Sequence, residues 1–78
     1  MEPKEIKQKL ESSFSPYRCV AEISEFEDRI QFRVFNENNE TIITSPEIKI
    51  YEDFHVSSLI PIIKKAKDEI KKKNYVID

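Results

Sequence analysis

The chain has 78 residues, of which 38% are hydrophobic and 36% charged, and its formal net charge is −2. A chain of this length has room for one hydrophobic core, which excludes a separate catalytic domain. Its single cysteine cannot form an internal disulfide, and no apolar run approaches the roughly 20 residues that span a bilayer, so we expect a cytoplasmic protein without membrane contact.

The residues needed for known catalytic chemistry are scarce. There is no glycine, and phosphate-cradling loops and nucleotide fingerprints depend on glycine. One histidine and one cysteine do not make a metal site, so we expect a non-enzymatic protein without cofactor or metal. Cys19 falls on the inward parity of a predicted strand and is expected to be buried. His55 lies in a predicted loop and has no assigned role.

The N-terminal segment, residues 3–14, is predicted to be a helix. Pro3 suits a first helical position, and Pro16 ends the element. The apolar stripe that we expect to face the core recurs at i, i+4 and i+8: Ile6, Leu10 and Phe14.

Three strands are predicted next, over residues 17–24, 29–36 and 41–51, because polar and apolar side chains alternate there. Three asparagines in the loop 36–40 replace the missing glycine, since Asn tolerates left-handed backbone conformations. Pro46 cannot donate a ladder hydrogen bond, so the third strand is either an edge strand or is broken by a bulge.

A C-terminal helix is predicted over residues 58–74, capped by Ser57 or Ser58, with Pro61 in its first turn and Asn74 as its stop. Its expected core stripe is Leu59, Ile62, Ile63, Ala66 and Ile70. Its outer face offers the i, i+4 ion pairs Lys65–Glu69, Asp68–Lys72 and Glu69–Lys73. Whether the tail that follows docks onto the domain is left open.

The order of elements is therefore α-β-β-β-α in a single domain, residues 1–78. The simplest packing for this order is a three-stranded antiparallel meander with both helices on one face, an α+β fold.

The run from Glu11 to Cys19 reads Glu-Ser-Ser-Phe-Ser-Pro-Tyr-Arg-Cys. It resembles the acidic-x-x-Phe-x-Pro-x-Arg-Cys signature of a small bacterial family, known mainly from pseudomonads and catalogued as domain of unknown function 1652. Further matches in kind and spacing are the strand Ile30 to Phe35 with Arg33, Ser57-Ser58 with Leu59, Ile63, and Glu69-Ile70. The chain departs from the family in lacking glycine at its hairpins. The resemblance implies a compact αβ domain and supplies no activity.

The sheet face opposite the helices is the first candidate binding surface. Its predicted members are Val20, Arg33, Phe35, Ile43 and Tyr51. Aromatic and arginine side chains on one surface are typical of interface hot spots, so we expect a protein partner or self-association there. A protein is favoured over nucleic acid because the acidic remainder of the domain would repel phosphate.

The lysine-rich C-terminal helix supports the alternative, nucleic-acid binding. The residues that would contact phosphates are Lys64, Lys65, Lys67, Lys71 and Lys72. Carboxylates interleave with these lysines, so a solvated helix face is the simpler interpretation. A third hypothesis is that the chain is a phage- or mobile-element-encoded inhibitor of a host complex.

Overall fold

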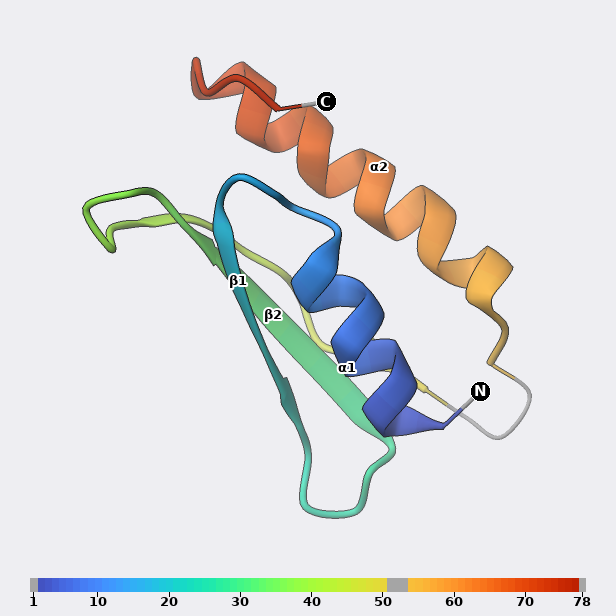
Figure 1. The fold of residues 1–78 in the computed structure, drawn as a ribbon. Helices are drawn as coiled ribbons and strands as arrows, with labels where there is room; N and C mark the ends of the chain where they lie inside the picture. Colours follow the sequence, from blue (N-terminus) through green and yellow to red (C-terminus); the bar gives the residue numbers. More distant parts are fainter. Residues whose placement is uncertain (1, 51–53, 78) are drawn as a thin grey trace.

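The computed structural model describes residues 2–50 and 54–77. Its elements, in chain order, are α1 (Pro3–Ser12), β1 (Arg18–Ile23), β2 (Arg29–Phe35), β3 (Thr41–Thr44), β4 (Ile48–Lys49) and α2 (Val56–Lys72). The two helices lie on the same side of an antiparallel sheet (Figure 1). The predicted α+β fold and its order of elements are confirmed. No helix in the described ranges is both long and apolar enough to cross a bilayer.

β2 is the central strand. It pairs with β1 along one edge and with both β3 and β4 along the other. The predicted third strand is therefore an edge strand and is also interrupted, because Pro46 lies between β3 and β4 and has no N–H to donate.

Ser45 holds the sheet together at this interruption. Its backbone N–H donates to the Phe32 carbonyl at 2.8 Å, and its hydroxyl accepts the Phe32 N–H at 2.9 Å. From the other face of the sheet, the Gln31 side-chain amide donates to the Ser45 carbonyl at 2.9 Å. The serine hydroxyl thus replaces a backbone acceptor that the broken strand does not supply.

The core fills the space between the sheet and the helices. Its most deeply buried large side chains are Phe14, Phe32, Ile6, Leu10, Ile30, Leu59, Ile70 and Val34. α1 ends two residues earlier than predicted, because the hydroxyls of Ser12 and Ser13 both donate to the Lys9 carbonyl. Phe14 therefore belongs to the following turn, where its ring stacks on Phe32 with centroids 5.3 Å apart.

The sequence-based register of the third strand is wrong. Simple alternation predicts Ile43 on the open face, but the register shifts between Val34 and Phe35: Val34 faces Ile43, whereas Phe35 faces Thr41. A bulge adds one residue to β3 at this point, so both Ile42 and Ile43 are buried. Ile43 consequently lies on the helix-covered side of the sheet.

The start of α2 also differs from the prediction. The helix begins at Val56 with His55 at its N-cap, and the His55 side chain makes no capping hydrogen bond. Pro61 is thus the sixth helical residue rather than a member of the first turn. Since proline has no N–H, it cannot donate to the carbonyl of Ser57, four residues earlier.

Within residues 2–50 and 54–77, the left-handed backbone conformation occurs at Glu27 with φ 58°, Asn39 with φ 61° and Asn74 with φ 71°. Asn39 confirms that asparagine replaces glycine in the second hairpin, and Asn74 follows the end of α2 at Lys72. Glu27 lacks the short polar side chain that makes this conformation accessible to asparagine, so its left-handed backbone costs about 1 kcal/mol of conformational free energy.

The C-terminal tail docks onto the domain. The ring of Tyr75 meets that of Tyr17 edge-on with centroids 5.8 Å apart, and the Asn36 side-chain amide donates to the Tyr75 hydroxyl at 3.3 Å. Ile77 is buried in the core, whereas Val76 between them points to solvent. The tail therefore closes the end of the core that lies beside the second hairpin.

A candidate binding face on the open side of the sheet

The open face is the side of the sheet that the helices leave uncovered. Cross-strand pairs place Arg18 beside Phe35, Val20 beside Arg33, and Glu22 beside Gln31 on this face. Arg33 is exposed, whereas Val20 and Phe35 are half-buried. Three of the five predicted partner-binding residues therefore come together here. Ile43 lies on the opposite side of the sheet, and Tyr51 lies outside the described residues.

Arg18 shapes the end of this face. Its guanidinium carbon lies 4.6 Å from the centroid of the Phe35 ring, and its Nη2 donates to the Asn39 side-chain oxygen at 3.3 Å. Cation–π stacking of this kind keeps both side chains ordered. The contact follows from the β1–β2 register, which depends on the length of the acidic turn between the strands and is not visible in either strand alone.

Next to this pair the face is slightly hollowed. A depression of about 40 Å³ is lined by Val20, Glu22, Gln31, Arg33 and Phe35. Its lining therefore combines two apolar side chains with one amide, one cation and one carboxylate. The Arg33 side chain makes no hydrogen bond or ion pair within the described part of the chain, so its guanidinium is available to an incoming group.

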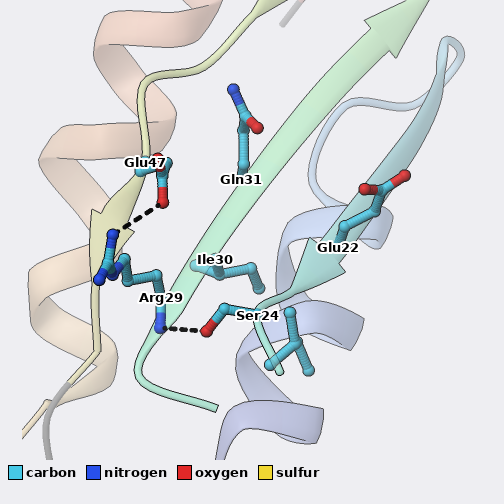
Figure 2. A pocket seen from close by; sticks show the side chains of 7 residues that line it. Glu22, Ser24, Arg29, Ile30, Gln31 and Glu47 are labelled. Carbon is cyan, nitrogen blue, oxygen red and sulfur yellow. Dashed lines mark hydrogen bonds and ion pairs between the residues drawn. The ribbon is translucent and has the colours of Figure 1, made fainter. Parts of the chain in front are cut away.

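A second hollow, of about 130 Å³, lies near the hairpin that joins β1 and β2 (Figure 2). Here the backbone N–H of Arg29 donates to the Ser24 hydroxyl, and its guanidinium reaches the Glu47 carboxylate at 3.5 Å. Glu22 and Gln31 line both hollows, so the two lie next to each other on the face.

The charge of the open face is opposite to that of the whole chain. Among the described residues it carries four basic side chains, Arg18, Arg29, Arg33 and Lys49, and two carboxylates, Glu22 and Glu47; a third carboxylate, that of Asp28, lies 3.9 Å from the Arg29 guanidinium. The argument that an acidic body repels phosphate therefore does not apply at this face. Four cations against three carboxylates leave this face with a net charge of +1, which favours anions only slightly.

Both edges of the sheet are protected against strand addition. Along β1, the Glu11 carboxylate of α1 accepts the Ala21 N–H at 3.0 Å and so occupies a donor that an added strand would need. The opposite edge is interrupted at Pro46 between β3 and β4. A partner that binds the sheet therefore meets its face more readily than its edge.

The lysines of α2 divide into two rows. By helical spacing, Lys64, Lys67 and Lys71 follow one line along the helix, and Lys65 and Lys72 follow another. Asp68 falls between the rows. None of the expected i, i+4 ion pairs forms in the described part of the chain, where the ion pairs are those of Arg29 with Asp28 and Glu47. Lys73 is held separately, donating to the Ile42 carbonyl at 2.6 Å.

Cys19 and His55 lie apart from the open face. Burial, with a smaller contribution from the nearby Glu11 carboxylate, raises the pKa of the Cys19 thiol to about 12. The thiol is therefore protonated and unreactive at neutral pH. His55 is exposed at the start of α2. Over residues 2–50 and 54–77, no three His, Cys, Asp or Glu side chains lie close enough together to hold a metal ion.

Comparison with protein-family models, with curated proteins and with solved structures finds no match for this chain. The resemblance of Glu11–Cys19 to the domain of unknown function 1652 family stays a prediction. Inference about function rests on the geometry of the molecule.

Proposed function

We propose that this chain is a small non-enzymatic protein-interaction module that binds a protein partner through the open face of its sheet. The observation that supports this most is the unpaired, exposed Arg33 beside the apolar depression formed with Val20 and Phe35. Arginine and aromatic side chains around a small pocket are the arrangement in which interface hot spots occur.

The charge of the face indicates the chemistry of the partner. Four basic side chains against three carboxylates, with Arg33 free of any ion pair within residues 2–50 and 54–77, favour an acidic protein surface, which would also accelerate the encounter. Nucleic acid is less suited to this face among the described residues, because Phe35 is its one aromatic ring and Arg18 already covers a side of that ring. Non-specific single-strand binding relies on exposed aromatic rings on which bases stack.

The test is a tagged pull-down from native lysate, with and without nuclease, followed by affinity measurement with the purified partner. We expect Arg33→Glu and Phe35→Ala each to weaken binding about tenfold or more, as hot-spot substitutions do. Lys64→Glu is the matched control, since Lys64 is an exposed cation on α2. The proposal is wrong if both open-face variants bind as the wild type does and leave the oligomeric state unchanged.

Nucleic-acid binding through α2 is the second candidate, supported by lysines that are free of the expected ion pairs. In that case the pull-down recovers nuclease-sensitive material, and affinity falls by about 0.7–0.9 log units per phosphate contact for each tenfold rise in salt. Because the lysines form two rows with Asp68 between them, we expect only one row to contact a given backbone. Affinity that is insensitive to salt excludes this candidate.

A further inference from the structure

A cleft lies between α2 and the interrupted edge of the sheet, on the side opposite the open face. Its volume is about 210 Å³. The apolar side chains that line it are Phe32, Ile43, Pro46, Ile48, Ile62 and Ala66. It forms where Pro46 separates β3 from β4, because the strand there does not continue under the helix. The bulge that turns Ile43 inward supplies part of its wall.

The mouth of the cleft carries two opposite charges one helical turn apart. Lys65 and Glu69 both line it, both are exposed, and they form no ion pair with each other in the described part of the chain. Side chains at i and i+4 are neighbours on a helix surface, so a single small ligand can reach both. The one hydroxyl in the lining, that of Ser45, is already engaged with Phe32 and Pro46.

These features select the chemistry of a ligand. An apolar group that enters the cleft displaces water from its walls, which is favourable. A simple carboxylate is attracted by Lys65 but repelled by Glu69. A simple ammonium is attracted by Glu69 but repelled by Lys65. A molecule that carries a carboxylate and an ammonium next to each other satisfies both charges.

We propose that this cleft binds a free apolar α-amino acid. The carboxylate pairs with Lys65, the ammonium pairs with Glu69, and the side chain lies among Ile43, Ile62 and Ala66. The site is on the other side of the sheet from the protein-binding face, so this inference stands independently of the proposed function.

The test is a titration of the isotopically labelled chain with L-leucine, followed by amide NMR spectroscopy. We expect saturable shifts at the amides of Ile43, Ile62 and Ala66. Lys65→Gln and Glu69→Gln should each weaken binding about tenfold, as the loss of a charge-assisted hydrogen bond does. Lys64→Gln and Asp68→Asn are matched controls on the same helix, and neither residue lines the cleft.

Three analogues of leucine test the ligand assignment. 4-Methylpentanoate lacks the ammonium, isopentylamine lacks the carboxylate, and N-acetyl-leucinamide lacks both charges. We expect each to bind at least about tenfold more weakly than leucine. Equal affinity for either singly charged analogue overturns the two-charge recognition. Equal affinity for N-acetyl-leucinamide shows that the cleft takes a peptide side chain instead, and the absence of saturable shifts at the three amides overturns the site itself.

Discussion

Replacing Ser45 by alanine removes the hydroxyl that joins the interrupted edge to the central strand. Ser45 is only 7% exposed, and its hydroxyl accepts the Phe32 N–H at 2.9 Å. Without that acceptor, the Phe32 N–H is left unpaired in the interior, which costs about 1–3 kcal/mol. A domain of this size has a total stability of about 8 kcal/mol at the average of roughly 0.1 kcal/mol per residue. The substitution should therefore remove a substantial fraction of the stability.

Urea denaturation measures this loss. With a slope of about 1 kcal/mol per molar urea, the midpoint should fall by about 1–3 M while the slope is unchanged. Hydrogen exchange gives a local readout, because the Phe32 amide should lose protection relative to its neighbours. Ser12→Ala is the control: its hydroxyl donates to the exposed Lys9 carbonyl, so the change should stay within about 0.5 kcal/mol. A Ser45→Ala variant with wild-type stability and a protected Phe32 amide would refute the role given to this hydroxyl.

Two further predictions concern the β1 side of the sheet. Folding raises the pKa of the Cys19 thiol from 9.0 to about 12, which lowers the fraction of thiolate near pH 8. The thiol should therefore react with iodoacetamide about a thousandfold more slowly in the folded chain than in urea. Similar rates in both states would contradict the burial argument. Because the folded pKa is the higher one, the stabilisation from this group is fully present below pH 9 and is lost as the pH rises towards 12, which denaturation at alkaline pH will show. Glu11→Ala frees the Ala21 N–H on the β1 edge, so it should lower the free energy of unfolding by about 1–3 kcal/mol and promote self-association, which sedimentation measures. Glu11→Gln retains an acceptor oxygen and should lose less stability. Equal stability of the two variants would show that the carboxylate does not protect the edge.

Much of the fold can be predicted from local patterns. The apolar spacing of Ile6 and Leu10 places the first helix on the core, and alternation over β1 and β2 assigns the correct residues to each face. Pro46 predicts that the third strand is either an edge strand or is broken, because proline lacks the donor that an inner strand requires, and the structure shows both an edge position and an interruption. Asn39 and Asn74 take the left-handed positions that glycine would otherwise occupy.

Local sequence patterns predict only part of the candidate binding face. Arg33, Phe35 and Val20 are placed on the open face by period-2 alternation within their own strands. The sequence-based prediction places Ile43 on the wrong face because a one-residue bulge reverses the side to which it points. No residue type in β3 indicates that bulge. The cleft under α2 is not visible in sequence either, since its walls come from three strands and a helix that are distant along the chain.

The amino-acid sequence by itself determines the order of helices and strands, the apolar faces of the helices and the absence of glycine-dependent loops, because these depend on side chains a few residues apart. Only the tertiary structure decides that Arg18 stacks on Phe35, that Glu11 occupies the Ala21 N–H, and that the tail reaches the core through Ile77. These contacts depend on strand register and on how the helices cross the sheet. Register and crossing are set by the packing of the whole core, and no local window of sequence contains that information.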